Sequence, residues 1–401
     1  MIDSCLVRHT NLGVVLLPTE ANKSPNNSTL LPAGLRDQLP PFASHEAALI
    51  EDIINSCESC GYERVKPPLV EFEDSLFFGP GETMMQSTFR LMDPISQRML
   101  GFRSDLTVQV ARIAASRLGH IPRPLRLCYA GQVLRVMPDD LSPERELVQV
   151  GAELIGEDNP LADIEVIFLA YDSLCKVGVE RISVDITVPS LVPSLIETLG
   201  LDSSCSTQLR GALDRKDTSA VKEIAGVNSK LFLELMSTAG EWESSLRKMK
   251  ALKLPEAANS IVDRLDTVAM SIAAEDKNIK ITLDPVERRG FEYYTGIGFS
   301  FFSNGVRGEL GRGGRYSLNE SSGASSCGFT LYMETLLRAL PEPIRKHRLM
   351  VPCSVARQDL IELRTKGWST VGLLREVSDL ETEARRLNCS HILVNETPKR
   401  I

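Results

Sequence analysis

The sequence lacks a long hydrophobic segment and has too little positive charge for a general nucleic-acid binder. No apolar run approaches the roughly 18 residues that a membrane-spanning helix needs, and the short run at residues 12–17 is too brief for a secretion signal. Lys and Arg number 45 against 53 Asp and Glu, so a broad phosphate-binding surface is disfavoured, although a local basic patch is compatible with these numbers. We therefore expect a cytoplasmic globular protein.

Regular cysteine and histidine patterns are also missing. The nine Cys form an odd set without a regular framework, which favours a reducing compartment over a disulfide-stabilised fold. Cys57 and Cys60 form one CxxC pair near the end of an expected helix, without a second pair nearby, and this position favours a structural role. The five His are dispersed and no P-loop pattern occurs, so we predict no metal site and no cofactor.

Hydrophobic periodicity predicts an α+β fold in three parts. Residues 1–30 are polar and predict a loosely ordered N-terminal arm. Residues 31–340 alternate between helical and strand patterns, which predicts an antiparallel sheet flanked by helices and interrupted by a helical insert at about 190–277. Residues 341–401 predict a small α/β unit.

The individual elements follow from the period of the apolar residues and from Pro and Gly. We expect core helices at residues 45–60, 106–118 and 161–177, an extended segment at 65–70, strands at 89–93, 99–103, 125–135, 146–155, 182–188, 279–283, 297–302 and 305–309, and a stretch at 328–340 that starts extended and ends helical. In the C-terminal unit we expect strands at 347–352, 369–374 and 391–394 and helices at 355–366 and 380–387.

The strongest functional signal is Arg-Arg-Gly-Phe-Glu-Tyr-Tyr-Thr-Gly at residues 288–296, followed by Gly-Arg-Gly-Gly-Arg-Tyr at 311–316. An Arg beside a Tyr pair suits a small zwitterion, because the guanidinium pairs with a carboxylate and the phenols provide an apolar wall with a polar tip. The second segment, interpreted as a loop, has three Gly that let the backbone approach a ligand. The pattern predicts an amino-acid pocket, and an ordinary hairpin with a core-packed Tyr pair is the alternative.

Six segments, in the right order, resemble the class II core of histidyl-tRNA synthetases over roughly residues 31–340. They are residues 65–71, similar to motif 1; 102–107, similar to the synthetase's Leu-Arg-Pro-Glu-Gly-Thr; 129–135 and 145–153, similar to the two halves of motif 2; 289–294, similar to Arg-Gly-Leu-Asp-Tyr-Tyr; and 313–316, identical to the family's Gly-Gly-Arg-Tyr. The resemblance implies a class II synthetase-like fold in which motif 1 builds a dimer.

The resemblance also implies a histidine pocket, because the matching positions carry groups that suit each part of that ligand. They are Asp105, Thr107 and Gln149 for the ammonium group, Glu153 and Tyr294 for the imidazole, Arg289 for the carboxylate, and Tyr293 and Tyr316 for the walls. Asp105 stands where the synthetase has Glu, one methylene longer. The alternative is structural: Asp105 and Glu153 would pair with Arg103 and Arg135, and Tyr316 would serve packing alone.

The sequence departs from the synthetases where they bind ATP and tRNA. Arg135 matches the motif 2 Arg and is a residual phosphate-binding candidate, but Thr335 replaces the motif 3 Arg that holds ATP. Arg338, one helical turn further on, would misplace that charge by several ångström. The C-terminal unit is shorter than an anticodon-binding domain and carries several acidic residues between 376 and 383, which would repel a phosphate backbone.

A histidine pocket without adenylation residues resembles a non-catalytic branch of the family, the regulatory subunits of ATP phosphoribosyltransferase. That branch implies the short-form catalytic ATP phosphoribosyltransferase as partner, a role in the first step of histidine biosynthesis, and histidine as feedback effector. It also implies a homodimer within a hetero-oligomer, no catalytic residues, and neither membrane nor tRNA as partner. The alternatives are an active histidyl-tRNA synthetase and another amino-acid-sensing or tRNA-modifying paralogue.

Overall fold

The computed structural model describes residues 30–77, 84–138, 143–287, 294–317 and 325–401, apart from the side chains of residues 203 and 204. Its centre is a nine-stranded sheet built from β1 (Glu63–Arg64), β5 (Leu125–Leu134), β6 (Glu146–Ile155), β7 (Ile182–Thr187), β8 (Gly240–Glu241), β9 (Lys280–Asp284), β10 (Tyr294–Ser303), β11 (Gly311–Ser317) and β12 (Ser325–Tyr332). The strands lie in the order β1-β5-β6-β12-β11-β10-β7-β9-β8. Two neighbouring pairs, β1 with β5 and β7 with β9, are parallel and the rest are antiparallel. The expected α+β fold with a mainly antiparallel sheet is confirmed.

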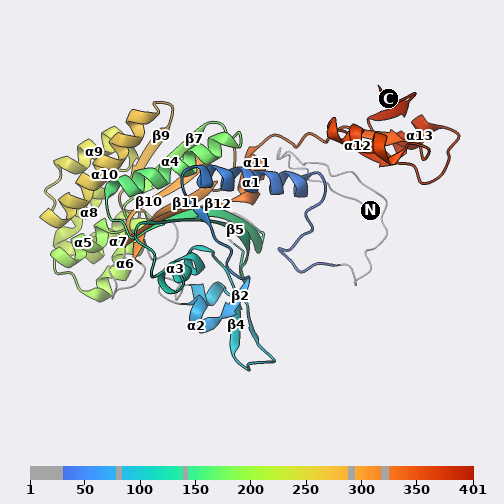
Figure 1. The fold of residues 1–401 in the computed structure, drawn as a ribbon. Coiled ribbons are helices and arrows are strands. Elements are labelled where there is room, and N and C mark those ends of the chain that lie inside the picture. Colours follow the sequence, from blue (N-terminus) through green and yellow to red (C-terminus); the bar gives the residue numbers. More distant parts are fainter. Residues whose placement is uncertain (1–29, 78–83, 139–142, 288–293, 318–324) are drawn as a thin grey trace, which may run out of the picture.

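Helices cover both faces of this sheet (Figure 1). α1 (Phe42–Ser59) and α4 (Pro160–Lys176) pack on one face, α3 (Thr107–Ser116) lies on the other, and α11 (Met333–Ala339) follows β12 directly. α4 begins where its sequence predicts, because Asn159 accepts a hydrogen bond from the Leu161 amide at 2.9 Å and Pro160 needs no amide partner. Within the described residues, no helix is both long and apolar enough to cross a bilayer.

The alternation of side chains along β6 separates two hydrophobic cores. Val150, Ala152 and Leu154 join the core beneath α1 and α4, whereas Leu147 and Ile155 join the smaller core beneath α3. Because successive strand residues point to opposite faces, the odd-numbered positions of β6 all face α3. This parity places Gln149 and Glu153, the two buried polar residues of β6, on the α3 face.

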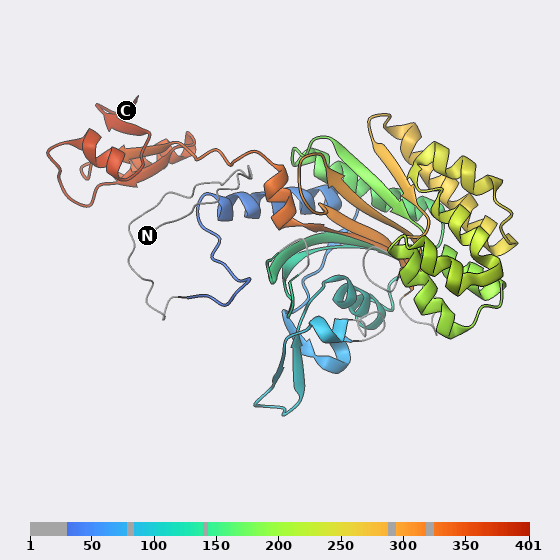
Figure 2. The same cartoon turned by 180° about the vertical axis from the view of Figure 1, so that it is seen from behind.

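The expected helical insert is confirmed, and it lies at one end of the sheet (Figures 1 and 2). Its hydrophobic residues, among them Leu209, Phe232 and Leu265, belong to the same core as α1 and α4. The insert is therefore packed on the sheet. Its helices are α5 (Leu191–Thr198), α6 (Ser203–Asp214), α7 (Thr218–Ala225), the 3₁₀ turn η3 (Gly226–Asn228), α8 (Ser229–Met236), α9 (Trp242–Ala251) and α10 (Glu256–Glu275).

A three-stranded sheet precedes α3 in the chain. It comprises β2 (Val70–Phe72), β3 (Arg90–Met92) and β4 (Met99–Phe102), with the short helix α2 (Glu73–Leu76) after β2. The antiparallel pair expected at 89–93 and 99–103 is confirmed by the β3–β4 pairing. The segment expected to be extended at 65–70 enters a strand at Val70 alone.

The C-terminal unit contains the expected three strands and two helices, and one strand more; the three expected strands are parallel. β13 (Arg348–Val351), α12 (Arg357–Thr365), β14 (Ser369–Gly372), α13 (Leu380–Arg386) and β15 (His391–Val394) lie close to the predicted ranges. The extra strand β16 (Thr397–Arg400) pairs with β15 across Asn395 and Glu396, which both have positive φ. Such a two-residue turn usually carries Gly, and because Gly is missing here the hairpin could not be recognised from the residues alone.

Two expectations around the second Gly-rich segment are wrong. Residues 305–309, expected to form a strand, form a turn in which Gly305 and Gly308 have φ values of 87° and 98°. Residues 311–316, expected to form a loop, belong to the central strand β11. The glycines of this strand are needed for close packing, because a Cβ on Gly313 would overlap the Phe299 ring and the carbonyl of Gly328.

Candidate functional site

The candidate pocket lies on the α3 face of the sheet, over β6, β11 and β12. Gln149 and Glu153 on β6 and Tyr316 on β11 all point to this face. Glu153 pairs in register with Gly328, and Gly328 with Gly314, so two neighbouring strands present no side chain beside the carboxylate. A Cβ on Gly328 would collide with the Glu153 carboxylate. The two glycines therefore leave space above the sheet next to Glu153, and we call this pair the glycine floor.

Glu153 is a buried carboxylate held by two tyrosines. The Tyr316 hydroxyl donates to Oε2 at 2.9 Å, and the Tyr129 hydroxyl donates to Oε1 at 3.2 Å. Thr107 extends this network, since its Oγ1 lies 3.1 Å from the Tyr129 hydroxyl. Burial raises the pKa of Glu153 from 4.5 to about 8, although the hydrogen bond from Tyr316 acts in the opposite direction. The pocket thus holds a carboxyl group whose charge is poorly solvated.

Asp105 is the second buried carboxylate, at the start of α3. Its Oδ1 accepts from the Thr107 amide at 2.8 Å, and its Oδ2 accepts from Gln149 Nε2 at 2.8 Å. Gln149 is oriented in turn by the Leu106 amide, which donates to its Oε1 at 3.0 Å. Burial raises the pKa of Asp105. Asp105, Thr107 and Gln149 therefore form one hydrogen-bonded unit, as expected for an ammonium site.

Within the described residues, the hydrogen-bond partners of these two carboxylates are hydroxyl and amide groups, and neither carboxylate forms a direct ion pair with Arg103 or Arg135. Arg103 donates to the backbone carbonyls of Gln132 at 2.6 Å and Pro67 at 2.9 Å. Arg135 is joined through its backbone to Arg145, whose carbonyl accepts from the Arg135 amide at 2.8 Å. The Arg103 side chain thus holds the neighbouring backbone in place, whereas Arg135 takes part through its backbone amide.

The structure brings six of the eight expected histidine-binding residues together. Asp105 and Gln149 are joined to the lining residue Thr107 by hydrogen bonds. The described lining of the pocket is Thr107, Glu153, Tyr294, Arg312, Gly314, Tyr316, Gly328, Phe329, Thr330 and Tyr332. The other two, Arg289 and Tyr293, lie outside the described residues. The lining side chains leave about 10 Å³ between them, so an amino-acid ligand enters only if some of these side chains move.

Four polar side chains that line or support the pocket were not among the predicted site residues: Tyr129, Arg312, Thr330 and Tyr332. Tyr129 and Thr330 hydrogen-bond to each other through their hydroxyls at 2.8 Å, across the sheet. Arg312, two positions before Gly314 on β11, points to the same face of the sheet as Tyr316. Its alternation with Tyr316 was the available signal, and interpreting residues 311–316 as a loop concealed it.

The three residues considered for nucleotide binding, Arg135, Thr335 and Arg338, lie outside the described lining of the pocket. The positive charge of Arg135 lowers the pKa of Asp105 from a distance. Thr335 is buried at the start of α11 and accepts a hydrogen bond from Arg338 Nη2 at 3.1 Å. Arg338 is therefore held at the Thr335 hydroxyl, one turn along the helix.

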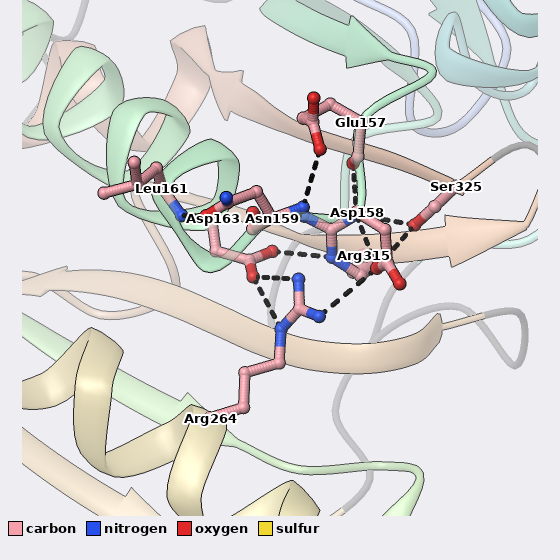
Figure 3. A network of polar contacts seen from close by, with 8 residues as sticks. All are labelled: Glu157, Asp158, Asn159, Leu161, Asp163, Arg264, Arg315 and Ser325. Atoms are coloured by element: carbon pink, nitrogen blue, oxygen red, sulfur yellow. Dashed lines mark hydrogen bonds and ion pairs between the residues drawn. The ribbon is translucent and has the colours of Figure 1, made fainter.

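An ion-pair network occupies the opposite face of β11 (Figure 3). Arg315, adjacent to Tyr316, donates from Nε to Asp163 Oδ1 on α4 at 2.9 Å. Arg264 on α10 of the insert donates to the other oxygen, Asp163 Oδ2, at 2.7 Å. The side chains of Arg315 and Asp163 are 4% and 1% exposed, whereas Asp158, a peripheral partner of both arginines, is 72% exposed. Asp163 thus joins the pocket strand to the helical insert.

Comparisons with known proteins agree with this fold. The histidyl-tRNA synthetase family matches residues 34–336. The ATP phosphoribosyltransferase regulatory subunit of Rhodospirillum centenum is 48% identical over 90% of this chain and 94% of its own length. An ATP phosphoribosyltransferase regulatory subunit/histidyl-tRNA synthetase from Bacillus halodurans has a TM-score of 0.79 at 24% identity, covering 90% of this chain and 97% of that one. A chain of the ATP phosphoribosyltransferase (HisG:HisZ) complex from Thermotoga maritima has a TM-score of 0.58 at 15% identity, over 72% and 97% of the two chains.

The sheet, its helices and the polar pocket on the α3 face define a class II core of the histidyl-tRNA synthetase type. Within that class, the chain belongs to the family of ATP phosphoribosyltransferase regulatory subunits. Its relatives over almost their whole length carry that name, so the chain is a regulatory component and not a catalytic one.

Glu153 should make the ligand-free protein less stable as the pH rises. Its pKa is about 8 in the folded chain against 4.5 for an ordinary Glu, so this stabilising contribution is full below pH 4.5 and is lost as pH rises through 8. The free energy of unfolding should fall by at most about 1.4 kcal/mol per pH unit from this group. Urea denaturation between pH 5 and 8 measures it. Glu153→Gln is the control and should give a flatter profile, although Glu334, with a pKa of about 7, still contributes a slope of the same sign. Parallel profiles for the two proteins would contradict the assignment.

Proposed function

We propose that this chain assembles with the short-form catalytic ATP phosphoribosyltransferase, is required for its activity in the first step of histidine biosynthesis, and mediates feedback inhibition by histidine. The observation that carries the proposal is the buried Glu153–Tyr129–Tyr316 network beside a glycine floor, in a chain whose relatives are named regulatory subunits. The likeness to a chain of the Thermotoga HisG:HisZ complex supports the partner. We further propose a cytoplasmic location and a homodimer within the hetero-oligomer.

The chemistry of the pocket fits histidine at two points. The Asp105 carboxylate, already oriented by Gln149, is an acceptor for the ligand's ammonium group. Glu153 lies deeper and accepts from an imidazole N–H, with Tyr294 in the same lining. A pocket of this kind discriminates against analogues that lack the imidazole N–H, because the buried carboxylate would then lose its solvation without gaining a donor. Arg289 and Tyr293 are retained in the proposal as further ligand-binding residues.

Feedback requires that histidine binds one state of the complex more tightly than the other. The inhibitory free energy equals that difference in affinity, and the catalytic subunit must in turn change the affinity for histidine by the same factor. The Tyr316 side of β11 is well placed for this role, since the adjacent Arg315 joins the insert through Asp163. β11 thus contributes Tyr316 to the pocket and Arg315 to the ion pairs that reach the insert.

Glu153→Gln should separate activation from inhibition. The complex of the variant with the catalytic subunit should keep its activity, while the histidine concentration for half-inhibition rises about 10- to 100-fold, because a carboxamide has one acceptor oxygen and an NH2 donor where the carboxyl group accepts from the imidazole N–H. Steady-state assays of the reconstituted complex, with calorimetric titration of histidine, measure both. Glu376→Gln, an exposed position in the C-terminal unit, is the matched control and should behave as the unmodified chain. Equal inhibition of the Glu153 variant and the control would refute the site, and absence of activation would refute the partner.

An active histidyl-tRNA synthetase is the second candidate, and the overall likeness to that family favours it. Thr335 argues against it, because a short neutral side chain cannot hold a nucleotide phosphate as an Arg does. Histidine-dependent exchange of pyrophosphate into ATP by the purified chain would overturn the regulatory proposal. Stable tRNA binding at physiological salt would favour a tRNA-modifying paralogue instead.

A further inference from the structure

Tyr332 is a buried tyrosine of the pocket whose hydroxyl has no partner. The residue is 9% exposed, and its hydroxyl makes no hydrogen bond in the described part of the structure. Buried phenol groups usually have a partner, because leaving one unpaired costs about 1–3 kcal/mol. Tyr332 belongs to the same pocket lining as Glu153, so its hydroxyl can donate a hydrogen bond to a ligand bound there.

Arg312 lies beside this hydroxyl and is the cation of the described lining. Its guanidinium carbon is 5.6 Å from the centre of the Tyr332 ring, within the range of a cation–π contact. Its Nε lies 2.8 Å from the Glu309 carboxylate, an ion pair that lacks the geometry of a hydrogen bond. A guanidinium suits a carboxylate, which it can bind through two parallel hydrogen bonds.

The strand register places this pair at the end of the pocket opposite Glu153. Arg312 pairs with Thr330, whereas Gly314 pairs with Gly328 and therefore lies level with Glu153. Two strand residues separate the levels, which corresponds to about 7 Å along the sheet. Tyr332 pairs with Gln149, the partner of Asp105. Glu153 and the two glycines thus lie at one level of the sheet, and Arg312 and Tyr332 lie further along it, on the side of Gln149 and Asp105.

We propose that Arg312 and Tyr332 bind the α-carboxylate of an amino acid whose side chain reaches Glu153. This inference rests on the proposed function, which places the amino acid in the pocket, and it adds the residues that distinguish an amino acid from the corresponding amine. The Tyr332 hydroxyl donates to one carboxylate oxygen and the Arg312 guanidinium to the other. Glu309 forms an ion pair with Arg312 and therefore competes with the ligand's carboxylate for the guanidinium.

The test compares the affinities of histidine and histamine for the unmodified chain and for Arg312→Gln, with three further variants beside them. Histamine is histidine without the carboxylate, so the unmodified chain should bind histidine about 10- to 100-fold more tightly than histamine by calorimetry. Arg312→Gln should lose that factor for histidine and bind histamine within about threefold of the unmodified chain. Tyr332→Phe should lose part of the same discrimination, and Glu309→Gln should increase it. Arg338→Gln, an arginine outside the lining, should leave both affinities unchanged.

The outcomes separate this inference from the proposed function. Absence of histidine binding to the unmodified chain would overturn both. Histidine binding that Arg312→Gln weakens to the same extent as histamine binding, or leaves unchanged, would overturn the carboxylate assignment alone. Loss of discrimination in Arg289→Gln but not in Arg312→Gln would also overturn it, in favour of Arg289. Arg312→Lys keeps the charge without the planar fork and should show intermediate discrimination, which guards against a variant that fails to fold.

Discussion

Asp163→Ala lowers the free energy of unfolding by about 3–5 kcal/mol, because it removes the carboxylate that two arginines share and leaves the buried Arg315 charge without its main partner. This is the largest single loss that the described ion pairs predict. Among the described residues, the remaining acceptors of Arg315 are carbonyls, the Ser325 hydroxyl and the exposed Asp158. Denaturant unfolding followed by circular dichroism measures the change.

Asp158→Ala is the matched control, since Asp158 contacts the same two arginines. Its side chain is 72% exposed, so its loss should cost less than about 1 kcal/mol. Equal losses for the two variants would mean that burial does not set the strength of this network. A loss of histidine response in the Asp163 variant at temperatures where it remains folded would show that the network also transmits the ligand signal.

Gly328→Ala should abolish histidine binding. Its methyl group would occupy the space of the Glu153 carboxylate and approach the carbonyl of Ala152 at 2.8 Å, so either the carboxylate or the strand pairing must shift. We expect at least a hundredfold loss of affinity and a destabilisation of about 1–3 kcal/mol, the usual range for overpacking a core. Calorimetry with histidine and thermal unfolding measure the two effects.

Gly372→Ala is the control for this prediction. Gly372 also lies in a strand, but an added Cβ there would meet only the Val351 side chain, at the ordinary distance of 3.9 Å. Its effect on stability should be within about 1 kcal/mol, and histidine binding should not change. Retained histidine binding in Gly328→Ala would mean that the glycine floor is not part of the ligand site.

The strands and helices with regular periods were predictable from sequence. β5, β6 and α4 lie within a few residues of the expected ranges, because each carries a long apolar pattern of a single period. β11 was not predictable in this way, since its glycines erase the alternation that identifies a strand. β16 was missed because the Asn395–Glu396 turn lacks the Gly that usually signals a hairpin.

Site residues at motif positions could be predicted from the sequence. Site residues that reach the pocket only through the pairing of distant strands could not. Asp105, Gln149 and Glu153 follow from motif positions, and the structure groups them as expected. The pairing of Tyr129 with Thr330 spans 201 positions and depends on the register of three strands. Arg312 is a comparable case, because only the pairing of β11 with β12 places it beside Tyr332.

The two faces of β11 have a consequence for how the chain can vary in length. Tyr316 faces the pocket and Arg315 faces the ion-pair network, and side chains alternate with a period of two. Deleting or inserting a single residue within Gly311–Ser317 would exchange these faces, pointing a guanidinium at Glu153 and a phenol at Asp163. Point substitutions on β11 can therefore alter one face at a time, whereas a one-residue change in length disrupts the pocket and the network together. Homologous chains should keep the length of this strand even where its composition drifts.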